Sequence, residues 1–240
     1  KNYKKIAHRD NNGTVYNLYE GLKSSSGRII KPISPGDALI SDSSLYNWAK
    51  ALVDSNMKWS FSDAVYYSYI EKKENKPNTF SGLAHPRGVK PYLKNSYKIC
   101  RRNYVVYNDI VLGATTICYR DMLLKYTEII LGKVIYAEDN MYRIMVYDGY
   151  VPYYYPSNTI YYEYGTGVST SNNKLWSNKI SSDWEATDCI MDGRKCDDKF
   201  IYMYKNKSNK VANYLLRLHV LAIKGIKRIL RCCYCRRTEI

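Results

Sequence analysis

Residues 143–165 read RIMVYDGYVPYYYPSNTIYYEYG, and this stretch carries most of the information about the fold. It contains eight tyrosines and neither phenylalanine nor tryptophan. A tyrosine ring is apolar, but its hydroxyl needs a hydrogen-bond partner when the ring is buried. So many phenols cannot all find partners in the centre of a small core. We therefore expect several of them to line a surface or a groove.

Short β-branched and aromatic runs surround this stretch, and turn residues separate them at intervals of about ten residues. The runs are NYVVYNDIVLG (103–113), TTICYRD (115–121), EIILGKVIYAED (128–139), MYRIMVYDG (141–149) and NTIYYEYG (158–165). Within 141–149, apolar and other side chains alternate, and the Asp148-Gly149 pair indicates a hairpin. The spacing predicts a small β-barrel or meander.

Residues 132–161, GKVIYAEDNMYRIMVYDGYVPYYYPSNTIY, resemble the second half of a Tudor domain. In this comparison Gly132–Ile135 is the second strand and Tyr142–Tyr147 is the third. YDGYVPYY (147–154) is the hairpin to the fourth strand, and DIVLGATTICYRD (109–121) supplies the first. The hairpin is similar to that of the tandem Tudor segment in a group of histone lysine methyltransferases. The SET catalytic motifs of those enzymes are absent from the sequence, so methyltransferase activity is not implied.

The resemblance covers residues 104–164 and implies an SH3/Tudor-like β-barrel with an aromatic cage for a methylated or basic peptide. One departure concerns the aromatic pair that Tudor readers commonly carry just before the second strand. Glu128, Ile129 and Ile130 stand at those places. The candidate ligand-binding residues are the cage walls Tyr119, Tyr126, Tyr147 and Tyr150 and the carboxylate of Asp148.

The region before the barrel is predicted to contain helices. Leu45, Trp48, Ala49, Leu52 and Val53 recur at helical spacing after a cap at Asp42 or Ser43. A second helix is expected over residues 63–72, whereas the first thirty residues are expected to form turns and loops. These elements predict an α+β chain with a break near residue 95. Its parts are a mixed helical region (1–95), the barrel (96–170), and a linker with a basic helix (171–240).

The net charge of +15, from 37 Lys+Arg against 22 Asp+Glu, favours an anionic partner such as nucleic acid, an acidic tail or a membrane surface. A helical wheel over residues 211–231 separates basic residues from an apolar face. Such a helix can bind anions or pack on the domain with its charges in solvent. The candidate anion-binding residues are Arg217, Lys224, Lys227, Arg228 and Arg231.

Catalytic and metal-binding motifs are sparse. The sequence has three histidines and lacks G-x-S-x-G, H-E-x-x-H and P-loop patterns. Glu138 and Asp139 are adjacent carboxylates, which fit either a metal-dependent nuclease or a solvated turn. Three cysteines, Cys232, Cys233 and Cys235, are compatible with zinc binding, acylation or no special role. The sequence therefore predicts a protein that is not an enzyme and has neither a cofactor nor a metal.

Three functions follow as hypotheses. The first is a binding module whose tyrosine-rich barrel recognises a methylated or basic peptide or protein tail. The alternative is a nucleic-acid-binding or structural component of a ribonucleoprotein or virus. The third is an interaction protein that docks on membranes through its basic, cysteine-rich tail. The odd number of seven cysteines favours a reducing compartment, nuclear or cytoplasmic, although a chain beginning at Lys1 is compatible with a removed leader. The sequence contains no apolar run of about 18 residues, so we expect no membrane span.

Overall fold

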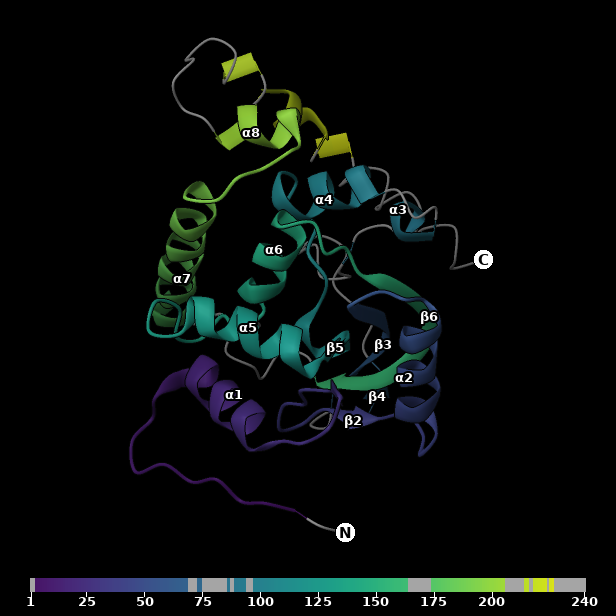
Figure 1. Cartoon of the computed structure of the whole chain (residues 1–240). Helices are drawn as coiled ribbons and strands as arrows, with labels where there is room; N and C mark the ends of the chain where they lie inside the picture. Colours follow the sequence, from purple (N-terminus) through teal and green to yellow (C-terminus); the bar gives the residue numbers. More distant parts are fainter. Residues whose placement is uncertain are drawn as a thin grey trace.

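The computed structural model describes residues 3–68, 73–74, 86, 89–93, 97–163, 174–205, 214–215, 218–223 and 225–226. These residues form a mixed α/β structure around one curled sheet (Figure 1). The strands are β1 (Ile29–Ile30), β2 (Ala38–Leu39), β3 (Trp59–Ser68), β4 (Lys73–Glu74), β5 (Thr116–Tyr119) and β6 (Tyr153–Glu163). The helices are α1 (Gly13–Ser24), α2 (Ser44–Asp54), α3 (Lys90–Leu93), α4 (Tyr97–Val105), α5 (Arg120–Ile130), α6 (Asn140–Tyr147), α7 (Lys174–Asp192) and α8 (Lys199–Lys205), with a short 3-10 turn, η1 (Gly113–Thr115).

The sheet has the strand order β1-β5-β3-β6-β2, and β4 pairs with β3. The two long strands, β3 and β6, are parallel and lie side by side, with Phe61 opposite Tyr154. The remaining pairs are antiparallel. A parallel pair needs a long crossover connection. Here that crossover contains α3, α4, η1, β5, α5 and α6, which is how the helical layer is attached to the sheet.

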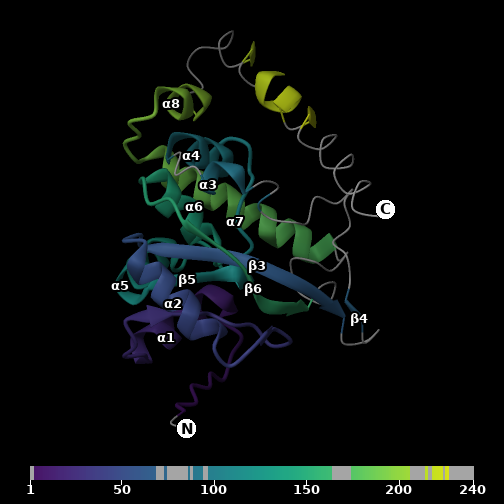
Figure 2. The same ribbon diagram turned by 90° about the vertical axis from the view of Figure 1, so that its right-hand side faces the viewer.

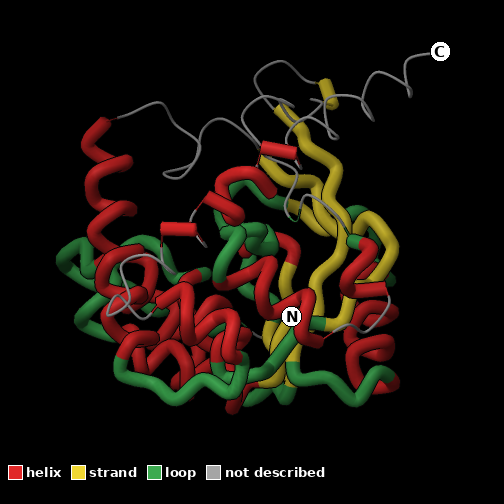
Figure 3. Tube along the Cα trace, turned by 90° about the horizontal axis from the view of Figure 1, so that it is seen from above, coloured by secondary structure: helices red, strands yellow, loops and turns green. Residues whose placement is uncertain are grey.

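Helices cover both faces of the sheet (Figures 2 and 3). On one face, α2 packs Trp48 and Leu52 against Ile117 of β5. On the other face, Trp59 and Phe61 of β3 join the larger core formed with α1, α4, α5, α6 and α7. This division follows the alternation of side chains along a strand. The sheet thus separates a small hydrophobic cluster from a large one.

Helix α2 confirms the prediction made from the periodic residues after Ser43. Trp48 and Leu52 are buried on its inner face, and Ser43 is the N-cap residue. The indole Nε1 of Trp48 donates a hydrogen bond to the Ser60 hydroxyl at 2.9 Å. The position of α2 on the sheet is therefore fixed by apolar burial and by one buried polar contact.

Two expectations about the N-terminal region were wrong. Residues 13–24, which were expected to lie in loops, form α1 and bury Val15 and Leu22. Residues 63–68, which were expected to start a helix, belong to β3, and residues 69–72 lie outside the described ranges. Val65, Tyr66 and Tyr67 favour a strand when neighbours pair on both sides. β6 pairs with residues 63–67 of β3, and β4 pairs with Tyr67 and Ser68 on the other side.

The strands expected at the centre of the barrel were also wrong. Tyr142–Tyr147 lies within α6, and Gly132–Ile135 is an irregular connection between α5 and α6. All eight residues of α6 are buried. In a short segment that is buried on every side, the spacing of apolar residues does not distinguish a helix from a buried strand. The segment 147–154 consequently leads from a helix into β6 and is not a hairpin between strands.

Other parts of the predicted β-structure are present. Of residues 109–121, Thr116–Tyr119 forms β5, and the tyrosine-rich residues 153–163 form the single long strand β6. The sheet takes its strands from both the N-terminal region and the region expected to form the barrel. Mixed helix and strand content agrees with the predicted fold class. The five basic residues of the predicted C-terminal helix, and Cys232, Cys233 and Cys235, lie outside the described ranges.

Candidate active site

The Glu138–Asp139 turn joins the α5–α6 connection to the start of α6. Asp139 is the N-cap residue of α6, but its side chain makes no capping hydrogen bond. Its surroundings are densely packed, yet Asp139 keeps part of its surface accessible. Burial, followed by the charge of Glu138, raises the pKa of Asp139 to about 7, although Arg143 and nearby backbone amides act in the opposite direction. Asp139 is thus a deep carboxyl group that changes protonation near neutral pH.

Glu138 differs from its neighbour in having a close partner. Its Oε2 lies 2.6 Å from the hydroxyl of Thr14 in α1. Burial also raises the pKa of Glu138, and the Thr14 hydrogen bond opposes that change. The two carboxyl groups therefore have different surroundings, which is how one fold gives adjacent acids different roles. Residues 138 and 139 do form a turn, in which both residues are half-buried.

The 3-10 turn η1 forms one wall beside Asp139. A side chain at Gly113 would place its Cβ only 3.3 Å from the Cβ of Asp139. The hydroxyl of Thr115 donates to the carbonyl of Leu112 at 2.8 Å, and the hydroxyl of Thr116 lies 2.7 Å from the carbonyl of Gly113. These contacts hold η1 against the sheet. The small residue at 113 therefore allows η1 to approach Asp139 closely.

Lys31, which follows β1, also contacts η1. Its Nζ donates to the carbonyl oxygens of Pro32 and Ala114, the latter at 2.7 Å. Burial lowers the pKa of Lys31 to about 8, and the charge of Asp37 partly opposes this change. Ala114 belongs to η1, so the same short turn contacts Asp139 at one residue and Lys31 at the next. Both groups have pKa values within about one unit of neutrality, a property that is frequent in catalytic sites.

Asp37 lies close enough to Lys31 for their charges to interact, and it also contacts the sheet. Its Oδ1 accepts a hydrogen bond from the backbone N–H of Glu163 at 3.1 Å. Glu163 is the last residue of β6, so Asp37 lies at the carboxyl end of a parallel strand. Burial raises the pKa of Asp37, and the Glu163 amide and Lys31 oppose this effect. Ligands of open α/β sheets bind at carboxyl ends of strands.

The residues proposed as an aromatic cage lie in three different surroundings. Tyr126 is 1% exposed, and its hydroxyl donates to Asp148 at 2.7 Å. Asp148 is also paired with Arg194, and the Tyr150 ring meets the Tyr126 ring edge to face at 6.2 Å between centroids. Three of the five residues, Tyr126, Asp148 and Tyr150, are therefore brought together.

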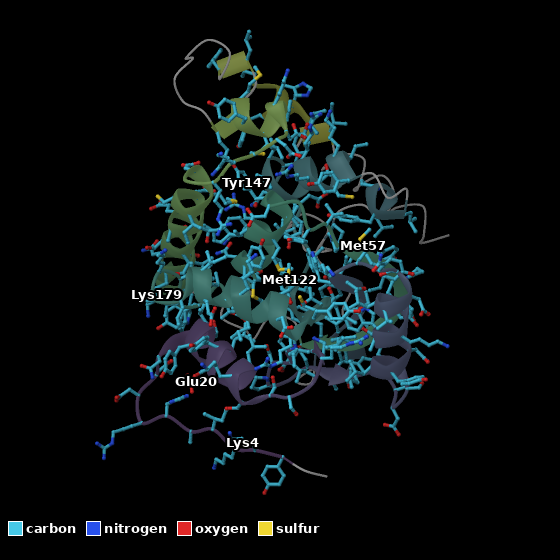
Figure 4. The ribbon with its side chains drawn as sticks, in the orientation of Figure 1. Lys4, Glu20, Met57, Met122, Tyr147 and Lys179 are labelled. Carbon is cyan, nitrogen blue, oxygen red and sulfur yellow. The ribbon has the colours of Figure 1, made fainter. Side chains whose placement is uncertain are left out.

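Tyr119 and Tyr147 lie elsewhere. Tyr119 packs with the small cluster under α2, and Arg28 and Lys58 lie over its ring. Tyr147 is 3% exposed and lies near the connection between α7 and α8, where its hydroxyl is 3.4 Å from the carbonyl of Arg194 (Figure 4). The structure does not bring these two rings to the other three.

One of the predicted residues, Tyr150, also lines a cavity of about 280 Å³. It lies between the turn before β3 and the turn before β6, and Lys58 is its charged lining residue. Tyr92 and Tyr97 also line it. These cavity residues were not predicted to form one site, because helices α3 and α4 were not expected from the sequence.

The structure bears on metal binding, cysteine pairing and membrane spanning only for the residues that it describes. Among those residues, no group of three or more His, Cys, Asp or Glu side chains is arranged to hold a metal ion. The described cysteines, Cys100, Cys118, Cys189 and Cys196, are free thiols. None of the helices within the described ranges combines the length and the apolar character needed to cross a bilayer.

Sequence reasoning identified Glu138 and Asp139 as neighbouring carboxylates but missed Thr14, Lys31 and Asp37. Asp37 follows Pro35-Gly36, which signals a turn and nothing more. Lys31 stands in no motif. The contacts of these residues join segments about a hundred residues apart, so no local pattern could have revealed them.

Comparison with known proteins adds no family to this description. No protein-family model matches the chain, and no curated protein matches it significantly.

Proposed function

We propose that this chain is an acid–base enzyme in which Asp139 is the general base. In the proposed reaction, a hydroxyl group of water or of an alcohol binds beside η1. Asp139 takes the proton while the oxygen attacks an activated substrate and the leaving group departs with its electron pair. The observation that carries the proposal is the placement of Asp139, a half-buried carboxyl group that lies beside Glu138 and next to η1. This placement raises its pKa to about 7.

A general base works best when its pKa is close to the working pH, because it must be deprotonated and still hold a proton strongly. An ordinary aspartate, with a pKa near 4, accepts a proton from an alcohol poorly. Burial beside Glu138 moves Asp139 into the useful range. The amides of Asp139 and Asn140 lower the pKa of Asp139, but burial and the charge of Glu138 outweigh them.

Lys31 is proposed to stabilise negative charge that develops on the substrate. Its ammonium group is anchored by the carbonyl of Ala114, the residue of η1 that follows Gly113. A buried cation is more effective than one in water, because solvent screens it less. With a pKa of about 8, Lys31 is largely protonated at neutral pH.

Two measurements test the proposal. In the first, ¹³C NMR of labelled aspartate follows the titration of Asp139, which we expect near pH 7. In the second, activated donors of three classes are offered with water or a polyol as acceptor: nucleoside diphosphate sugars, acyl thioesters and nucleoside triphosphates. Asp139→Asn is expected to reduce turnover at least about 100-fold. Asp121→Asn, at a carboxylate that is 95% exposed, is the matched control and should keep full turnover.

The proposal fails if Asp139 titrates near pH 4 or if Asp139→Asn retains the activity of the parent chain. If the pKa of Asp139 is raised but Asp139→Asn keeps its turnover, Asp139 is a buried structural acid. The control distinguishes the loss of one catalytic group from a general effect of removing a negative charge.

Peptide recognition by an SH3/Tudor-like surface is a weaker proposal. Its support is the group formed by Tyr126, Asp148 and Tyr150, of which Tyr150 also lines the aromatic cavity. Against it, Tyr126 and Tyr147 are buried, and Asp148 is already paired with Arg194. Binding of trimethyl-lysine peptides that is lost in Tyr150→Ala would favour this alternative.

Binding to an anionic partner, nucleic acid or membrane, is proposed on the net charge of +15 alone. Counterion release predicts that nucleic-acid affinity falls steeply with salt. An oligonucleotide titration at 50 and about 200 mM salt tests this alternative.

A further inference from the structure

The connection that carries Glu138 and Asp139 is held from both sides by segments distant in sequence. Asp183 of α7 contacts it on one side. The Oδ1 of Asp183 accepts the backbone N–H of Ile135 at 3.1 Å, and its Oδ2 accepts those of Tyr136 and Ala137 at 2.8 and 3.0 Å. One carboxylate therefore satisfies three consecutive amides.

Asp183 is 5% exposed, so these hydrogen bonds are shielded from water. Hydrogen bonds to an ionised acceptor are stronger than those between neutral groups. Because three amides in a row point at one side chain, the backbone of residues 135–137 has little freedom to rotate. The position of the following two residues is fixed as a consequence.

The start of α1 contacts the same connection from the opposite side. The backbone N–H of Val15 donates to the carbonyl of Ile135 at 3.1 Å, and the Thr14 hydroxyl lies 2.8 Å from the carbonyl of Tyr136. The N–H groups of the connection thus face α7, whereas its carbonyl groups face α1. Few backbone conformations satisfy both sets of partners.

We propose that Asp183 is a positioning residue that holds Asp139 in its working place through the backbone of residues 135–137. This inference rests on the proposed function, because it assigns Asp183 a role in the same site. Asp183 does not contact the substrate in this scheme. Its effect on the reaction is geometric, and misplacing a catalytic group by about 1 Å is enough to lower turnover about 100-fold.

Asp183→Asn provides the test. The amide keeps one oxygen acceptor and puts an NH₂ group against the remaining N–H donors, so part of the contact is lost at nearly constant volume. We expect faster hydrogen exchange of the amides of residues 135–137, a changed Asp139 titration, and turnover reduced about 10- to 100-fold. The shape of the pH profile should change as well. A defect confined to stability would leave that shape unaltered.

Asp192→Asn is the matched control. It lies on the same helix, and its carboxylate pairs with Lys205 at the surface instead of with backbone amides. The titratable groups that bear on Asp139 are Glu138, Arg143, Tyr104 and Tyr142, none of which is replaced in either variant. The charge of Asp183 itself acts on Glu138, so the Asp139 titration is interpreted together with the exchange of the amides of residues 135–137. We therefore expect the titration of Asp139 in Asp192→Asn to match that of the parent chain.

The outcomes separate this inference from the proposed function. Unchanged amide exchange and an unchanged Asp139 titration in Asp183→Asn overturn the positioning role, whatever the activity. Altered exchange and titration, together with full activity in Asp139→Asn, keep the positioning role and overturn the proposed function. If Asp183→Asn does not fold, Asp183→Glu keeps the negative charge and displaces it by one methylene group. Unchanged amide exchange at residues 135–137 and an unchanged Asp139 titration in that variant overturn the inference.

Discussion

The guanidinium group of Arg101 lies between the rings of Tyr97 and Tyr147, with its central carbon 5.7 and 5.9 Å from the two ring centroids. Arg101 is buried and donates to the carbonyl of Tyr147 and to Asp197. Tyr147 does contribute to an aromatic arrangement around a cation. The cation belongs to this chain, however, and the arrangement joins α4 to the end of α6.

Tyr147→Ala is expected to destabilise the fold by about 3–5 kcal/mol, the usual cost of removing a large buried ring. Loss of the attraction between the ring and Arg101 is included in that cost. Urea unfolding measures the effect. Tyr147→Phe keeps the ring and should cost less than about 1 kcal/mol, because its hydroxyl is 3.4 Å from its acceptor. A mild effect of the alanine variant would mean that Tyr147 is not a core residue.

The contact between α2 and the sheet gives a second prediction. Ser60→Ala leaves the buried Nε1–H of Trp48 without its acceptor, which should cost about 1–3 kcal/mol. The double variant with Trp48→Phe removes both polar groups, and the effects of the two substitutions should not add. Additive effects in a double-mutant cycle, measured by urea unfolding, would show that the hydrogen bond contributes nothing.

The part of the fold that could be predicted from sequence is the part with one buried face. Helix α2 has a single inner side, and Trp48 and Leu52 mark it. In α6 all sides are buried, so the alternation of Tyr142, Ile144 and Val146 carried no information about secondary structure. The resemblance to a Tudor barrel used this segment as its third strand, together with residues 132–135 and the hairpin at residues 147–154.

The candidate site was predictable only as a pair of neighbouring acids. What raises the pKa of Asp139 is burial by segments from other parts of the chain, η1 among them. Burial of this kind is a property of tertiary structure. A sequence shows which groups can ionise, but it does not show which of them are removed from water.

The raised pKa of Asp139 predicts how stability depends on pH. The folded protein holds a proton on Asp139 up to about pH 7, whereas the unfolded chain releases it near pH 4. The free energy of unfolding should therefore fall as pH rises from about 4 to about 7. Asp139→Asn removes this contribution. We expect it to be more stable than the parent chain above pH 7, by about 2–4 kcal/mol, with a difference that shrinks toward pH 4.

Urea unfolding at pH 4.5, 6 and about 7.5 measures this dependence. Glu138 also has a raised pKa, so part of the slope should persist in the variant. The exposed control Asp121→Asn should follow the parent chain at every pH. A constant difference between Asp139→Asn and the parent would show that Asp139 titrates normally in the folded state.

Two glycines of α1 give a matched pair of substitutions with opposite expected signs. Gly13 has a φ of +86°, and a Cβ there would lie 2.5 Å from the carbonyl oxygen of Ile135. Gly13→Ala should therefore destabilise the fold by more than about 1 kcal/mol and displace the connection that carries Asp139. Gly21 lies in the same helix with open space around it. Gly21→Ala should stabilise the fold by about 0.5–1 kcal/mol, because glycine weakens helix interiors. Thermal unfolding compares the two variants, and equal shifts in Tm would contradict the close approach of α1 to residue 135.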